Sequence, residues 1–131
     1  MKHKILIIED NEQNMYLMTF ILEKAGHEII QARDGKEGIR KAHETKPDAI
    51  LLDIQLPELN GYEVAGELRN NHSLGNVPII AVTSYAMVGD KEQILAAGAT
   101  GYIEKPINPD TFVTQIQEFL PPQQHKRRNE P

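Results

Sequence analysis

Apolar and polar positions fall into blocks along the chain, and five short apolar-rich blocks have the length and composition of β-strands. They cover residues 5–8, 27–32, 49–52, 78–82 and 101–104. Blocks 5–8 and 49–52 contain only apolar residues, which is typical of strands buried on both faces inside a parallel sheet.

The segments between these blocks have the three- and four-residue apolar spacing of helices. In the first segment, Met15, Met18 and Leu22 share one face, Asn11 is a candidate N-cap, and Gly26 is a stop signal. Four more helices are predicted: from Asp34, which forms a capping-box pattern with Glu37; from Asn60-Gly61; over 90–97; and from Asn108, which would cap a helix with Pro109 in its first position.

Strand and helix thus alternate five times, which predicts an α/β fold with helices on both faces of a parallel sheet. The 131 residues suit one domain with one core. We assign residues 1–120 to this domain and expect the polar, proline-containing stretch 121–131 to be a disordered tail. Its basic run, 125–128, is best explained as a solubilising end, because four residues make a poor footprint for an acidic partner or nucleic acid.

Every block except 27–32 leads directly into residues that can do chemistry. Glu9 and Asp10 follow the first block, Asp53 the third, Thr83 the fourth and Lys105 the last. All strands of a parallel sheet end at one edge, which is where open α/β folds bind their ligands. We therefore expect three carboxylates, a hydroxyl and an amine to meet on one small surface.

Taken singly, each of these side chains has an ordinary explanation. Asp53 resembles a turn acid, Glu9 and Asp10 a solvated loop or helix cap, Thr83 a strand residue and Lys105 a surface charge. Their convergence from four separate places in the chain favours a functional site.

Three neighbouring carboxylates repel one another, and a bound cation relieves the repulsion. Oxygen ligands of this kind suit a hard divalent ion such as Mg²⁺ or Mn²⁺. If such a cation and Lys105 neutralise a phosphoryl group, and Thr83 donates a hydrogen bond to it, Asp53 becomes a candidate nucleophile that forms an aspartyl phosphate.

Charge and composition exclude several classes of partner and of site chemistry. The net charge of −5 gives no general attraction to nucleic acid or anionic membranes, and the absence of cysteine excludes disulfides and thiolate chemistry. No signal peptide or membrane span is evident, so a soluble cytoplasmic protein is expected. The five histidines (positions 3, 27, 43, 72 and 125) show no metal-ligand spacing and are expected at the surface.

Four short motifs resemble the receiver domain of two-component response regulators, the flavodoxin-like fold of CheY with strand order 2-1-3-4-5. They are residues 7–11 (IIEDN), 52–61 (LDIQLPELNG), 81–84 (AVTS) and 102–106 (YIEKP), and the resemblance extends over residues 4 to about 120. It implies that Glu9, Asp10, Asp53 and the backbone carbonyl of Gln55 hold the metal ion. It also implies that Asp53 accepts phosphoryl from a histidine kinase or phosphotransfer protein, that Thr83 and Lys105 bind the transferred group, and that the Lys105-Pro106 peptide is cis.

The resemblance also implies a switch. Thr83 would move toward the phosphoryl group and the ring of Tyr102 into the space it leaves, which changes a docking surface on the fourth helix, fifth strand and fifth helix for a downstream protein. The stretch 84–90 and the Asp53 region look closest to single-domain regulators of the DivK type. Tyr85 is interpreted either as a shield that protects the aspartyl phosphate from water or as an exposed, partner-facing residue.

Two other functions compete with this phosphoacceptor switch, which would do no catalysis beyond slow self-dephosphorylation. A haloacid-type phosphatase also uses an aspartyl nucleophile and Mg²⁺, but it needs a general acid two residues later, where this chain has the amide Gln55. A pseudo-receiver that docks constitutively would not need the complete set of acids, hydroxyl and lysine.

Overall fold

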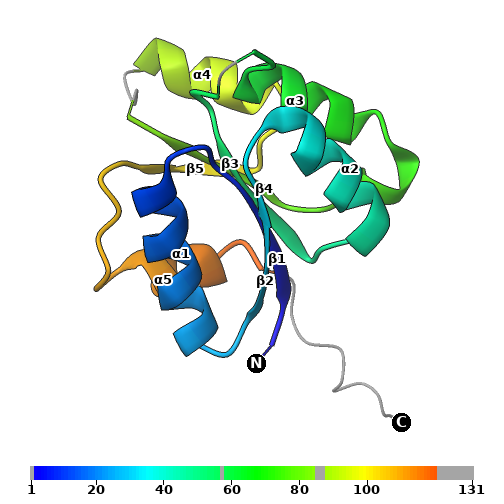
Figure 1. Ribbon diagram of the computed structural model, residues 1–131. Helices are drawn as coiled ribbons and strands as arrows, with labels where there is room; N and C mark the ends of the chain where they lie inside the picture. Colours follow the sequence, from blue (N-terminus) through cyan, green and yellow to red (C-terminus); the bar gives the residue numbers. More distant parts are fainter. Residues whose placement is uncertain (1, 57, 85–87, 121–131) are drawn as a thin grey trace, which may run out of the picture.

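A five-stranded parallel sheet forms the centre of the computed structural model, which describes residues 2–56, 58–84 and 88–120. The strand order is β2-β1-β3-β4-β5, as expected (Figure 1). The strands are β1 (Lys4–Ile8), β2 (Glu28–Ala32), β3 (Ala49–Asp53), β4 (Ile79–Thr83) and β5 (Gly101–Glu104). Strands β1 and β3 are interior strands, and their apolar residues are fully buried because helices cover both faces.

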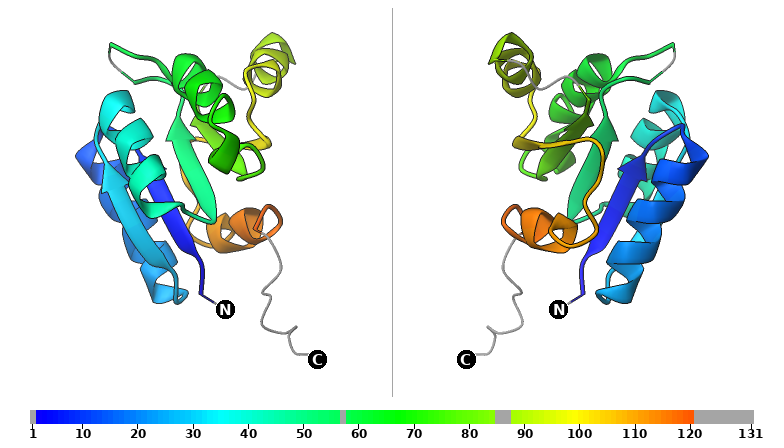
Figure 2. Two further views of the ribbon diagram at one scale, coloured as in Figure 1. Left: turned by 90° about the vertical axis from the view of Figure 1, so that its right-hand side faces the viewer. Right: turned by 90° about the vertical axis from the view of Figure 1, so that its left-hand side faces the viewer.

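The helices form two layers, one on each face of the sheet (Figure 2). On one face, α1 (Glu12–Lys24) and α5 (Phe112–Gln117) pack their apolar side chains against Ile5, Ile7 and Leu51. On the other face, α2 (Gly35–Thr45) and α3 (Gly61–Arg69) pack against Leu6, Ile8, Ile50 and Leu52, and α4 (Val88–Ala96) lies beside α3 and contacts β5. A short 3₁₀ turn, His72–Leu74, precedes β4.

Several helix starts follow the predicted caps. The Asn11 side chain accepts a hydrogen bond from the Asn14 N–H at 2.9 Å, and Asn60 forms a complete capping box at the start of α3. At α2, Asp34 caps the Glu37 N–H at 2.8 Å, but the Glu37 carboxylate accepts from the N–H of Arg33, one residue before the cap.

The prediction for the last helix is wrong at its start. Helix α5 begins at Phe112 with Thr111 as its N-cap residue, three residues later than Asn108 and Pro109 suggested. The Asn108 side chain instead accepts a hydrogen bond from the Asp110 N–H at 2.9 Å. This local Asx turn satisfies the side chain and leaves residues 108–111 as a turn.

Two of the histidines expected at the surface are buried, which corrects that prediction. His3 and His27 are 6% and 5% exposed, and the His3 N–H donates a hydrogen bond to His27 Nδ1 at 3.1 Å. Lys4 pairs with Glu28 in the sheet, so the residues just before them are neighbours at the amino ends of β1 and β2. His43 is exposed as expected, whereas the side chain of His72 and all of His125 lie outside the described part of the structure.

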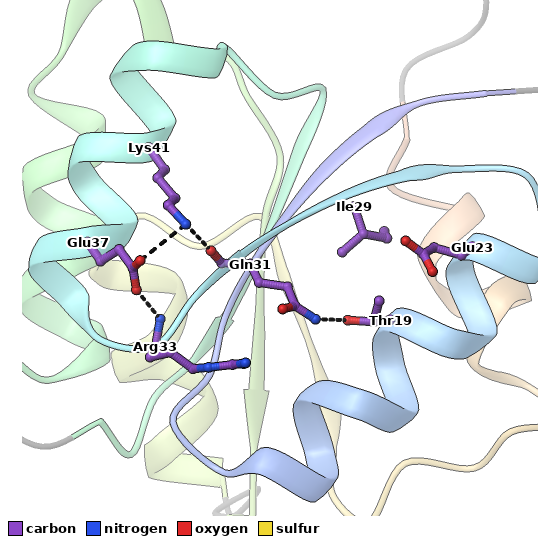
Figure 3. A pocket seen from close by; sticks show the side chains of 7 residues that line it. All are labelled: Thr19, Glu23, Ile29, Gln31, Arg33, Glu37 and Lys41. Carbon is purple, nitrogen blue, oxygen red and sulfur yellow. Dashed lines mark hydrogen bonds and ion pairs between the residues drawn. The ribbon is translucent and has the colours of Figure 1, made fainter.

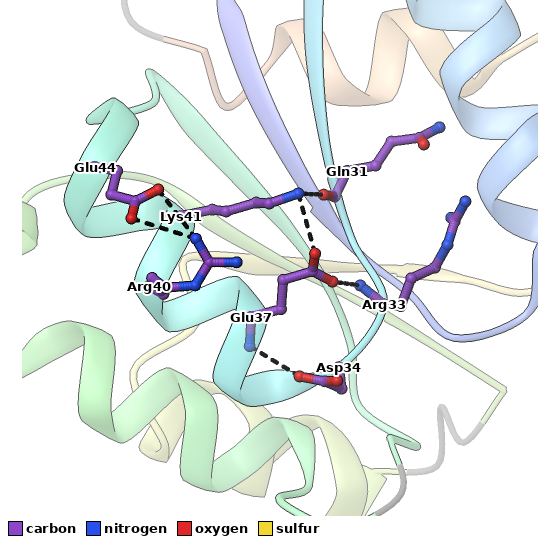
Figure 4. A network of polar contacts seen from close by, with 7 residues as sticks. All are labelled: Gln31, Arg33, Asp34, Glu37, Arg40, Lys41 and Glu44. Atoms are coloured by element: carbon purple, nitrogen blue, oxygen red, sulfur yellow. Dashed lines mark hydrogen bonds and ion pairs between the residues drawn. The ribbon is translucent and has the colours of Figure 1, made fainter.

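Strand β2 forms one edge of the sheet, and α2 covers part of that edge with charged side chains. The Lys41 amine donates to the Gln31 carbonyl at 2.6 Å and pairs with Glu37 at 3.1 Å (Figure 4). A charged cap of this kind protects an edge strand from pairing with another chain.

Beside this edge lies an open groove of about 480 Å³, lined by Thr19, Glu23, Ile29, Gln31, Arg33, Glu37 and Lys41 (Figure 3). Its lining includes none of the acids predicted to bind a metal ion. Over the described residues, no helix is long and apolar enough to cross a membrane.

Candidate functional site

The sheet register brings the chemically capable residues together at the carboxyl edge. Ile8 pairs with Leu52, so Glu9 and Asp53 come next on adjacent strands β1 and β3. Asp53 pairs with Val82, which places Thr83 one step further along β4. Lys105 follows β5, and its N–H donates to the Thr83 carbonyl at 2.8 Å.

Glu9, Asp10 and Asp53 form a cluster in which one oxygen from each lies within 4.8 Å of the others. Glu9 is fully buried and Asp53 is 3% exposed, whereas Asp10 is exposed. Burial, and then the charge of Asp53, raise the pKa of Glu9 to about 7. The Asn11 N–H donates to Glu9 Oε2 at 3.1 Å and partly offsets this rise.

Lys105 supplies the positive charge of the site. Its Nζ lies 3.4 Å from Glu9 Oε1 and 3.3 Å from Asp53 Oδ1, and its side chain is only 14% exposed. The Lys105-Pro106 peptide is cis, as expected. Among the described residues, one ammonium group therefore faces two buried carboxylates, and the charge between them is only partly neutralised.

The turn after β3 fixes the Asp53 carboxylate. The Gln55 N–H donates to Asp53 Oδ1 at 2.9 Å, and the Gln55 side-chain oxygen accepts from the Ser84 N–H at 3.2 Å. Sequence reasoning missed this second contact because a backbone donor such as Ser84 N–H has no signature in the sequence.

Gly61 lets α3 begin directly against the end of β3. A Cβ atom at this position would lie 2.5 Å from Ile54 Cα and 2.7 Å from the Asp53 carbonyl oxygen. The Asn60-Gly61 pair is thus explained by a cap and by a close backbone approach next to Asp53.

The two residues of the switch prediction, Thr83 and Tyr102, lie on the neighbouring strands β4 and β5. Thr83 is fully buried at the end of β4, and half-buried Tyr102 packs beside Ile54, Ala81 and Ile94. The Lys91 amine lies 5.2 Å from the centre of the Tyr102 ring, and a hydrogen bond to Tyr102 raises the pKa of Lys91. Tyr85 lies outside the described residues, so the shield hypothesis stays a prediction.

The donor set fits a hard divalent cation. Three carboxylates converge, two of them are buried, and one carries a pKa raised toward neutrality by its burial and its acidic neighbour. Such a set favours oxygen-preferring ions such as Mg²⁺ over soft transition metals. The Gln55 carbonyl as a further ligand stays a prediction.

Comparisons with known proteins point in one direction. The family model described as response regulator receiver domain matches residues 5–117. The polar-differentiation response regulator DivK of Brucella anthropi is 44% identical over 120 residues, which cover 92% of this chain and 98% of that protein.

Two solved structures illustrate the likeness in fold. The chemotaxis protein CheY4 of Vibrio cholerae has a TM-score of 0.88 at 30% identity and covers 92% of this chain and 100% of its own. The receiver domain of the sensor histidine kinase PA1611 from Pseudomonas aeruginosa, solved with magnesium in its active site cleft, has a TM-score of 0.83 at 34% identity, over 91% and 98% of the two chains.

Proposed function

The chain belongs to the response regulator receiver domain family, and from this premise we propose that Asp53 is the phosphoacceptor of a two-component phosphorelay. The observation that carries the proposal is the burial of Asp53 at the end of β3, with Lys105 Nζ at 3.3 Å and two further acids beside it. In the reaction, an Asp53 oxygen forms a bond to phosphorus as the bond from phosphorus to a histidine nitrogen of the donor protein breaks.

Each neighbour of Asp53 has a separate task. Lys105 neutralises charge on the transferred group, and Thr83 donates a hydrogen bond to it. The Gln55 N–H holds the carboxylate in a fixed orientation through Oδ1. Because Lys105 and the Gln55 N–H already contact Asp53, these two groups need little reorganisation when the phosphoryl donor arrives.

Glu9, Asp10 and Asp53, with the Gln55 carbonyl, are proposed to hold Mg²⁺ or Mn²⁺. When bound, the ion supplies positive charge that allows a carboxylate to approach an anionic phosphoryl group. The magnesium in the cleft of the Pseudomonas receiver, which has a similar fold, supports the same assignment here.

The output is proposed to be a docking surface on α4, β5 and α5 that binds a downstream protein. Phosphorylation would draw Thr83 toward Asp53 and let the Tyr102 ring turn inward, which shifts the population between two packings. The 44% identity to the response regulator DivK supports an output through contacts of the receiver domain with other proteins.

The test is to add acetyl phosphate, or beryllofluoride, with Mg²⁺ to the wild-type protein and to the Asp53→Asn variant. We expect phosphate on Asp53 by mass spectrometry and metal-dependent NMR shifts around Thr83 and Tyr102, both absent from the variant. Lack of labelling under donor excess would refute the proposal.

The same two proteins test the two competing functions, with phosphate esters as substrates in one assay and a binding partner in the other. Sustained turnover of many phosphate esters would indicate the haloacid-type phosphatase instead. Identical binding of a partner by the activated wild type and by Asp53→Asn would indicate a constitutive docking module.

A further inference from the structure

Gln55 connects the ends of strands β3 and β4, because its backbone bonds to Asp53 and its side chain bonds to Ser84. Its backbone N–H donates to Asp53 Oδ1 at 2.9 Å, and its side-chain oxygen accepts from the Ser84 N–H at 3.2 Å. The side chain is exposed, so water could satisfy its amide, yet the structure directs it to a backbone group 29 residues away in the sequence.

The hydrogen bond between Gln55 and Ser84 lies just beyond the backbone ladder that joins β3 to β4. The ladder between β3 and β4 continues past the end of β3, where the Ile54 N–H donates to the Val82 carbonyl at 3.2 Å. The next carbonyl along β4, that of Thr83, accepts a hydrogen bond from the Lys105 N–H on the side of β5. The Gln55 side chain therefore forms the next connection from the β3 end to the chain leaving β4, in place of a backbone partner.

Thr83 is held between these two connections, one at Val82 and one at Ser84. A backbone shift that carries Thr83 toward Asp53 has to move Ser84 as well, and thus disturbs the geometry of the bond to Gln55. We propose that the Gln55 side chain is a resting-state latch, which opposes the Thr83 movement and is released when Asp53 is modified. This inference rests on the proposed function, since it concerns the same site.

The Gln55 side chain is coupled to Asp53 through the backbone of Gln55 itself. Because the Gln55 N–H is bound to Asp53 Oδ1, a new group on that carboxylate disturbs the position of Gln55 directly. Gln55 is a positioning residue in this scheme, because it acts on the switch through Ser84 and does no chemistry itself.

The expected effect of removing the latch follows from the strength of the hydrogen bond that it forms, which joins the neutral groups Gln55 Oε1 and Ser84 N–H. Removing it changes an equilibrium by roughly 2- to 10-fold, and the exposed position favours the lower part of this range. If the active packing is a minor state before phosphorylation, the apparent affinity for an activating ligand improves by the same factor.

The experiment compares two variants of similar shape. Gln55→Met removes the acceptor oxygen but keeps the chain length, and Gln55→Glu keeps an oxygen that can accept from Ser84. The first readout is hydrogen exchange of the Ser84 amide by NMR without ligand. We expect roughly 2- to 10-fold faster exchange in Gln55→Met, and protection close to wild type in Gln55→Glu.

The second readout is the beryllofluoride concentration at half-maximal NMR shift of Thr83, at fixed Mg²⁺, in wild type and Gln55→Met. We expect a midpoint lower by the same factor in Gln55→Met. Unchanged Ser84 exchange, or faster exchange with an unchanged midpoint, would overturn the latch.

Failure of the proposed function would look different. In that case wild type itself would show no Mg²⁺-dependent response that Asp53→Asn abolishes, and the switching role of Gln55 would fall with it. The Ser84 exchange data would still decide separately whether the bond restrains the chain after β4.

Discussion

Gly61 and Gly66 lie five residues apart in helix α3, and we predict that replacing each with alanine has opposite effects. A Cβ atom at Gly61 would lie 2.5 Å from Ile54 Cα and 2.7 Å from the Asp53 carbonyl oxygen, whereas a Cβ at Gly66 meets nothing within 4 Å. The first alanine therefore collides with the chain beside the proposed phosphoacceptor, and the second enters open space within a helix.

The magnitudes depend on the atoms involved. Main-chain atoms cannot turn aside as a side chain can, so Gly61→Ala should cost about 3 kcal/mol, the upper end of the range for overpacking. Gly66→Ala should instead stabilise the fold by about 0.5–1 kcal/mol, because alanine loses less conformational entropy than glycine in a helix.

Urea unfolding followed by far-UV circular dichroism measures both effects under identical conditions. With a denaturant dependence of about 1–3 kcal/mol per molar, we expect the Gly61→Ala midpoint to fall by roughly 1 M or more and the Gly66→Ala midpoint to rise slightly. Labelling of Asp53 by acetyl phosphate, measured without urea, should also be slower in Gly61→Ala, because relief of the collision displaces the Asp53 backbone.

A Gly61→Ala variant as stable as wild type would refute the predicted collision. A variant that is destabilised but accepts phosphoryl at the wild-type rate would refute the predicted displacement of Asp53. Gly66→Ala controls for the general effect of a methyl group in α3.

Three further predictions concern single side chains. Lys105→Met should lower the rate of Asp53 labelling by acetyl phosphate about 100-fold while circular dichroism stays unchanged, because it removes the charge beside the carboxylate; near-normal labelling would contradict this role. Burial, and then the charge of His3, lower the pKa of His27 in the folded protein. As pH falls, His27 is therefore protonated in the unfolded chain before it is protonated in the folded protein, and the free energy of unfolding should fall below about pH 6.5. His27→Gln keeps an acceptor for the His3 N–H and should flatten this pH dependence, whereas parallel pH profiles of the two proteins would refute the prediction. Arg69→Met should lower the free energy of unfolding, measured by urea unfolding, by about 2–4 kcal/mol, because the guanidinium donates to four backbone carbonyls at 2.6 to 3.3 Å. A decrease of less than about 0.5 kcal/mol would show that water replaces these hydrogen bonds.

The position of the acids was predictable from sequence because two physical rules act together. Wholly apolar blocks such as 5–8 and 49–52 are typical of interior parallel strands, and parallel strands place the residues after their carboxyl ends at one edge of the sheet. The order of the strands needed the family resemblance, since periodicity does not determine which strands are neighbours.

The features that were missed depend on contacts between distant segments. Burial of His3 and His27 results from the pairing of Lys4 with Glu28, and no local pattern in the sequence reveals that register. The start of α5 was wrong for a different reason: an Asn followed by Pro is compatible with a helix cap and with an Asx turn, and only the packing of Phe112 decides between them.

The electrostatics of the site show why this fold can present such a group of acids at all. Glu9 is fully buried with a pKa raised to about 7, so keeping it charged near neutral pH works against folding. The apolar residues of β1 and β3 immediately before Glu9 and Asp53 are also fully buried, so each of these two acids directly follows a stretch of the core that is closed to solvent. The burial and pairing of those two strands hold the carboxylates together against their repulsion. One ammonium group, from Lys105, faces both buried carboxylates, so any further cation that binds there would lower the free energy of the folded state.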